Sequence, residues 1–297
     1  MYINVRAARV WLALLALGAP LSQADARQVG LLVVAHGATA DWNAQVRGTV
    51  AQVTWRLGPT ATAFLMGPEA QSAGWDSAVA RLTSAGVRSV VVVPLMVSSF
   101  GSHYRQVRYY AGELDRLPAE LAGHDHASRA RPAVPMQVTP ALDAAPELLE
   151  AVANRWSALD LRLRTAPLVL LGHGPNDETD AERWTAAFHT ALARVRQLGH
   201  SHESRSALLR DDAAPSVRAD AIRRLRDSVT ALADRAGDSV TVMTVLVARG
   251  EMTGVRIPKD LDGLPIRYVP TGLTPLPAIA RWIERVAGEA IVKTGSR

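Results

Sequence analysis

The sequence predicts an α/β protein of two similar lobes, each a parallel β-sheet flanked by helices, with a cleft between the lobes. Three observations lead to this prediction. Short runs of valine and leucine alternate with amphipathic stretches, as in a parallel sheet covered on both faces. The second half of the chain repeats the order of the first half. Several apolar runs also end in short polar segments, where open parallel sheets bind ligands.

The first half contains three apolar runs that predict buried strands. They are GLLVVA from Gly30, TATAFL from Thr60 and VRSVVVVPLMV from Val87. A helix is expected after the first strand, because apolar residues recur there at helical spacing, at Trp42, Val46, Val50, Val53 and Leu57. A second helix is expected to end at Gly86. This order of elements predicts a parallel sheet with crossover helices.

The second half repeats these segments in order. APLVLLGHG parallels GLLVVAHG, SALLRDDA parallels TAFLMGPEA, and SVTVMTVLVARGEM parallels SVVVVPLMVSSFGSH. Four matches, including a later Thr-Pro segment in each half, indicate an internal duplication. The predicted organisation is a signal peptide, an N-terminal lobe, a connecting helix with linker, and a C-terminal lobe, at residues 1–26, 27–143, 144–164 and 165–297.

Composition excludes several kinds of site. The chain has no cysteine, so disulfides, thiolate zinc sites, iron–sulfur clusters and covalent haem attachment are excluded. Any metal must be held by His, Asp, Glu or water. The net charge of +5 is spread along the chain, without a basic block flanked by aromatics. Nucleic acid is therefore not expected as a partner, whereas a small molecule with several carboxylates fits the charge.

The N-terminus is typical of an export signal. Arg6 and Arg9 precede the apolar run VWLALLALGA, and Ala24–Ala26 offers an A-x-A cleavage site. The run is shorter than the ~20 residues of a membrane span. We therefore expect a periplasmic or secreted protein that would touch a membrane only through an uncleaved signal.

Two histidines follow neighbouring predicted strands. His36 comes directly after the first strand, and His103 follows the Ser/Gly-rich loop after the third. Either alone could cap a helix or bond to a turn. Together they favour a site, because two imidazoles can ligate a divalent ion or accept a proton near neutral pH. Glu69, after the second strand, is the candidate third metal ligand.

The segments LLVVAHGATADWN, VVVPLMVSSFGSHYRQ and VTPALDAAPELLEAV resemble the sirohydrochlorin cobaltochelatase/ferrochelatase family, the class II chelatases, in its doubled long form. The resemblance implies chelatase-like lobes. It also implies insertion of Co²⁺ or Fe²⁺ into a carboxylate-rich tetrapyrrole, with no cofactor beyond the substrate metal. His36 and His103 match the family's histidines, so the resemblance assigns them as catalytic metal ligands and proton acceptors.

Residues near His103 are candidates for binding the substrate. Arg105 and Arg108 could pair with its carboxylates, although a solvated helix face is an equally good interpretation. Ser99 and Ser102 are further candidates. The serines also raise the alternative of a hydrolase, but no Gly-x-Ser-x-Gly elbow is present to activate one of them.

The sequence departs from the family pattern at several positions. His173 matches His36, but Met252 stands where the first lobe has His103. His173 could therefore be an auxiliary base or a relic of duplication. Met66 and Val107 replace acids that the family often has. An exported carrier of divalent metal or tetrapyrrole, without turnover, thus remains the alternative. A doubled chain can build one complete cleft alone, so a monomer is expected.

Two smaller features complete the set of candidates. The His-x-His pairs are interpreted as solvated loop histidines, with weak metal binding as the alternative; they are His124 with His126 and His200 with His202. The adjacent Asp211 and Asp212 are interpreted as a cap for the following helix, with cation binding as the alternative.

Overall fold

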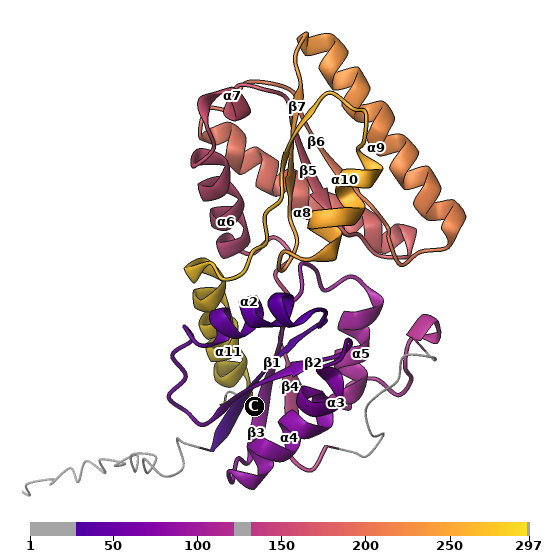
Figure 1. The fold of residues 1–297 in the computed structure, drawn as a ribbon. Coiled ribbons are helices and arrows are strands. Elements are labelled where there is room, and N and C mark those ends of the chain that lie inside the picture. The colour runs from indigo at the N-terminus through magenta and orange to yellow at the C-terminus, as the bar shows by residue number, and fades with distance from the viewer. Residues whose placement is uncertain (1–27, 122–131, 296–297) are drawn as a thin grey trace, which may run out of the picture.

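A computed structural model describes residues 28–121 and 132–295 and shows two α/β lobes (Figure 1). Each lobe contains one four-stranded parallel sheet, with strand order β2-β1-β3-β4 in the first and β6-β5-β7-β8 in the second. The equivalent orders confirm the predicted fold class. The predicted signal peptide and the pair His124 and His126 lie outside the described residues.

The strands follow the predicted apolar runs closely. In the first lobe they are β1 Val29–Ala35, β2 Thr60–Phe64, β3 Ser89–Pro94 and β4 Met136–Val138. In the second lobe they are β5 Leu168–Gly172, β6 Ser204–Leu208, β7 Val240–Thr244 and β8 Ile266–Val269. All six strand pairings are parallel, so each connection within a sheet is a crossover.

Helices cover both faces of each sheet. Those of the first half are α2 Ala40–Val50, α3 Ala70–Ala73, α4 Trp75–Ser84, α5 Ser102–Tyr110 and the 3₁₀ turn η1 Ala119–Leu121. Those of the second half are α6 Pro146–Ser157, α7 Leu161–Arg164, α8 Glu178–Gln197, α9 Pro215–Ala236, the π-helical η2 Met252–Arg256, α10 Ile257–Asp260 and α11 Pro277–Gly295. Within residues 28–121 and 132–295, no helix has the length and apolar character of a membrane span.

The central strands are buried on both sides. Leu31 and Val33 of β1 belong to a core that continues into the second lobe, whereas Leu32 and Val34 point into a separate core beneath α4 and α5. Successive strand residues point to opposite faces, so one apolar strand serves both helical layers.

The lobes exchange their last helices. Helix α6 packs beside α8 of the second lobe, while α11 returns to pack on β3 and α2 of the first lobe. Figure 1 shows α11 in the lower lobe beside strands that precede it by more than half the chain. Glu147 of α6 accepts two hydrogen bonds of 2.7 Å from Arg285 of α11. The lobe boundaries drawn along the sequence stay a prediction, but the two end helices cross between the lobes.

The first predicted helix is shorter than its apolar spacing indicates. Helix α2 ends at Val50, and Val53 and Leu57 lie in the loop before β2. There the Leu57 carbonyl accepts from the Val29 amide at 3.0 Å. Contact with the sheet, which the spacing could not reveal, therefore replaces the last helical turns.

Candidate functional site

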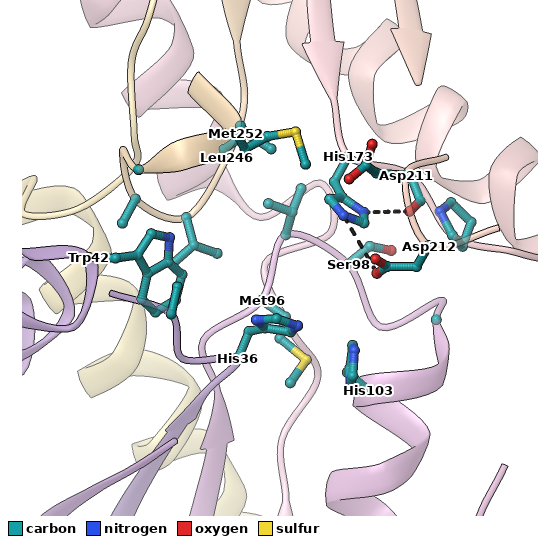
Figure 2. A pocket seen from close by; sticks show the side chains of 18 of the residues that line it. His36, Trp42, Met96, Ser98, His103, His173, Asp211, Asp212, Leu246 and Met252 are labelled. Carbon is teal, nitrogen blue, oxygen red and sulfur yellow. Dashed lines mark hydrogen bonds and ion pairs between the residues drawn. The ribbon is translucent and has the colours of Figure 1, made fainter. Parts of the chain in front are cut away.

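A cavity of about 360 Å³ lies between the two lobes, as the sequence predicts. It is lined by residues that follow β1 and β3 in the first lobe and β5, β6 and β7 in the second. The carboxyl ends of parallel strands meet at one edge of a sheet, and here two such edges face each other. Figure 2 shows His36 and His103 on one side of the cavity and His173 with Asp211 and Asp212 on the other.

His36 is held by the turn that ends β1. Its Nδ1 lies 2.8 Å from the Gly37 carbonyl, and because a carbonyl only accepts, Nδ1 carries the proton. Gly37 has φ +86°, and a Cβ there would lie 2.3 Å from the Met66 carbonyl oxygen. Only glycine fits this turn, which leaves His36 Nε2 as the acceptor nitrogen of the ring.

His103 stands in the first turn of α5 and is oriented from within the helix. Its Nδ1 donates to Oε1 of the fully buried Gln106 at 3.0 Å, and the Gln106 amide donates to the Tyr110 hydroxyl at 2.9 Å. With the Gln106 amide in this orientation, Nδ1 of His103 carries the proton and Nε2 is the acceptor nitrogen. A partner that holds one ring nitrogen is typical of metal-binding histidines.

The two imidazoles lie against each other. Their ring centroids are 4.7 Å apart, with an interplanar angle of 84°. Burial, with a further contribution from His103, lowers the pKa of His36 to about 4. His36 is thus neutral at physiological pH and offers a lone pair. It is suited to bind a divalent metal and is a weak base.

Three other predicted residues of the first lobe lie outside the cavity. Glu69 does not line it, because its carboxylate forms an ion pair with Arg47 of α2. Arg105 donates to Asp180 of α8 at 2.8 Å, which ties the two lobes together. Arg108 donates to Glu113 at 2.9 Å. Glu69 is therefore engaged by Arg47 outside the cavity, and both arginines serve in ion pairs.

The two candidate serines differ. Ser102 begins α5 and lines the cavity. Ser99 is absent from the lining: its hydroxyl donates to Asp143 at 2.6 Å and accepts from the Ala141 amide at 2.8 Å. These bonds fix the loop after β3, so Ser99 holds the loop that precedes His103.

His173 occupies in the second lobe the position that His36 has in the first. It follows β5, lines the same cavity, and its Nδ1 lies 2.9 Å from the Gly174 carbonyl. Asp211 and Asp212 do not cap the next helix as interpreted: α9 has Ala214 at its N-cap and no side-chain cap bond. They follow β6 and face the cavity beside His173, and their position after a strand was the signal for it.

Much of the cavity wall is apolar, which the sequence did not predict. The larger side chains come from both lobes and are Trp42, Leu95, Met96, Trp184, Leu246 and Met252. Met252, where the first lobe has His103, lies in η2 and faces the cavity. These contacts join positions more than 200 residues apart, so no local pattern carries them.

The described His-x-His pair is not a solvated pair. His200 is only 4 % exposed, packs edge-on to Trp156 at 5.7 Å and lies 3.2 Å from the Arg164 carbonyl. Burial lowers its pKa below the ordinary value. His202 is exposed, and its ring centroid is 6.1 Å from that of His200. His200 is therefore a buried packing residue against Trp156 of α6.

The two-lobed α/β fold matches that of solved sirohydrochlorin chelatases. SirB from Bacillus subtilis with Fe³⁺ superposes with a TM-score of 0.59 at 15% identity, over 91% of this chain and 98% of SirB. CbiX, named as the terminal enzyme for biosynthesis of siroheme in denitrifying bacteria, gives 0.54 at 18% identity, over 88% and 99%. A further SirB structure is in complex with cobalt.

Residues 30–159, the first lobe and α6, match the CbiX family model. Together with the two-lobed fold, this match confirms the resemblance to the class II chelatases that the sequence predicts. No curated protein matches the sequence significantly.

Proposed function

We propose that the protein inserts a divalent metal, Co²⁺ or Fe²⁺, into a sirohydrochlorin-type tetrapyrrole, using His36 and His103 of the first lobe. The observation that carries the proposal is the imidazole pair, with ring centroids 4.7 Å apart at the cavity and both Nδ1 atoms engaged. The match of residues 30–159 to the CbiX family model and the likeness of the fold to SirB and CbiX support it.

The cavity offers a surface for a flat macrocycle above the histidines. Trp42 and Met96 line it from the first lobe and Leu246 from the second. Apolar and aromatic side chains bind the faces of a macrocycle, and loss of water strengthens the interaction between a metal and imidazole. The coordination positions of the metal that the two imidazoles leave free would then face the pyrrole nitrogens.

Insertion releases two protons from the pyrrole N–H groups for each divalent ion taken up. As the metal moves from the imidazoles to the macrocycle, the Nε2 atoms recover their lone pairs and can accept these protons. Because burial lowers the pKa of His36 to about 4, this ring holds a proton only weakly. Metal ligand and proton acceptor are thus successive roles of the same rings.

The alternative is a carrier that binds divalent metal or tetrapyrrole without turnover. One observation favours it: no first-lobe carboxylate lines the cavity in the part of the chain that the structure describes. Glu69 is engaged by Arg47, and Met66 and Val107 stand where the family has acids. Such a protein would keep the imidazole pair but lack an efficient proton acceptor.

Export remains part of the proposal. The basic and apolar pattern of residues 1–26, with its A-x-A site, supports action in the periplasm or outside the cell. A monomer is proposed because both walls of the cavity come from one chain.

The test is an absorption assay with sirohydrochlorin and Co²⁺ at catalytic protein concentration. The proposal expects many insertions per chain for the wild type, and none above the uncatalysed rate for His103→Ala. Saturable binding at one equivalent, with no acceleration of insertion, would reject the enzyme in favour of the carrier.

A further inference from the structure

The second lobe places a mixed set of nitrogen and oxygen donors opposite the His36 and His103 pair. His173, Asp211 and Asp212 each offer one ligand atom, and these atoms all lie within 4.8 Å of one another. The three residues follow the carboxyl ends of β5 and β6 and line the cavity. They share no residue with the first-lobe pair.

The tautomer of His173 creates an unusual contact. The Gly174 carbonyl requires the proton on Nδ1, so Nε2 carries a lone pair. That lone pair lies 3.5 Å from Oδ2 of Asp212, which is also an acceptor. A positive charge between these two acceptors would turn their repulsion into attraction. A metal ion or a proton on Nε2 would supply it.

The surrounding charges favour a divalent ion. Asp211 accepts from Arg218 and Arg256 at 2.6 Å each, and these arginines also bind Asp260 and Glu251. Arg218 and Arg256 thus carry two positive charges among four carboxylates, and this group of side chains has a net charge of about −2. The four carboxylates are those of Asp211, Asp212, Asp260 and Glu251.

We propose that His173 and Asp212, with Asp211 as third donor, form a second divalent-metal site in the cavity. One imidazole with carboxylates suits first-row ions such as Co²⁺, Ni²⁺ or Zn²⁺ better than Mg²⁺, which prefers oxygen ligands. If the first lobe performs insertion, the second site holds an incoming ion across the cavity; this role rests on the proposed function, whereas the binding does not.

The experiment is equilibrium dialysis of the full chain against Co²⁺ without tetrapyrrole. A His124→Ala/His126→Ala background removes that pair from the count. The expected result is two ions for this parent, one for His173→Ala or Asp212→Asn, and one for His36→Ala. Exposed His189 and Asp234 supply matched controls, so His189→Ala and Asp234→Asn should keep two ions.

Asp212→Asn replaces one carboxylate oxygen by an NH₂ group on a half-exposed side chain, so it tests the site without unfolding the lobe. One ion in the parent that His36→Ala removes and His173→Ala retains would overturn the proposal. One ion that His173→Ala removes and His36→Ala retains would support it and reject only metal binding by the first-lobe pair. Two ions in both Asp212→Asn and His173→Ala would also overturn it. Because no macrocycle is present, failure of insertion and failure of the second site are separate results.

Discussion

The two lobes have the same sheet order but carry different chemistry at their strand ends. The first lobe presents His36 and His103, whereas the second presents His173 with two aspartates and has Met252 in place of the second imidazole. The buried strands of both lobes remain apolar and parallel. Core packing thus constrains the strands, while the loops after them can change without loss of the fold.

The largest expected effect comes from making the first lobe like the second. His103→Met copies the residue that Met252 supplies in the other lobe. A thioether cannot accept a proton and binds Co²⁺ or Fe²⁺ poorly, so the rate of insertion should fall by about 10²-fold or more. Steady-state kinetics with sirohydrochlorin and Co²⁺ measure this. If the insertion rate of His103→Met stayed within twofold of the wild-type rate, the imidazole of His103 would not be what distinguishes the chemistry of the first lobe from that of the second.

A smaller effect is expected from the residue that orients His103. Gln106→Leu removes the acceptor for Nδ1, so the ring loses its fixed tautomer, and the insertion rate should fall about 10-fold. Tyr110→Phe is the control, because it removes the bond from the Gln106 amide but leaves the acceptor for His103 Nδ1 in place, and it should have less effect. Equal rates for Gln106→Leu and the wild type would show that the helix alone positions His103.

The succession of strands along the chain and the position of His36 at the end of β1 could be predicted from the sequence, because they depend on local patterns. The apolar run and His36 beside Gly37 mark the end of β1 without any long-range information. The partners of Arg105 and Glu69 could not be predicted. Asp180 and Arg47 reach them only after the lobes and helices have packed.

The same limit applies to the second lobe. Asp211 and Asp212 match a helix-cap pattern in the sequence, but the turn after β6 directs them to the cavity instead. The sequence placed His173 correctly at a strand end. Its relation to the aspartates depends on the spacing between β5 and β6 in the sheet.

The exchanged helices give a prediction for stability. Glu147→Gln breaks the charge-assisted pair with Arg285 and should reduce the free energy of unfolding by about 2 kcal/mol at pH 7. The hydrogen bonds from Arg285 lower the pKa of Glu147 below its ordinary 4.5. Its contribution is therefore complete above pH 4.5 and is lost as the pH falls through the lower folded-state pKa.

Urea unfolding at pH 7 and pH 3 measures this difference. The difference in the free energy of unfolding between wild type and Glu147→Gln should be smaller at pH 3 than at pH 7. Glu150 pairs with Arg281 across the same two helices but is more exposed, so Glu150→Gln should cost only about 0–1 kcal/mol. If the loss of unfolding free energy in Glu147→Gln were the same at both pH values, the ion pair between Glu147 and Arg285 would be contradicted.

The smallest effect is expected for Arg105→Ala. This residue pairs with Asp180 across the lobes and does not line the cavity. The KM for tetrapyrrole should stay within about twofold of the wild type, and the free energy of unfolding should fall by about 0.5–1 kcal/mol. A large rise in KM with unchanged stability would return Arg105 to the substrate site.

The central claim is that the first lobe carries out insertion. The most direct test compares initial rates of Co²⁺ insertion for His36→Ala and His173→Ala at saturating metal. We predict that the insertion rate of His36→Ala falls to the uncatalysed rate. The His173→Ala variant should keep most of the wild-type kcat but need a higher metal concentration to reach it. Equal loss in both variants would contradict the claim and assign the reaction to both lobes together.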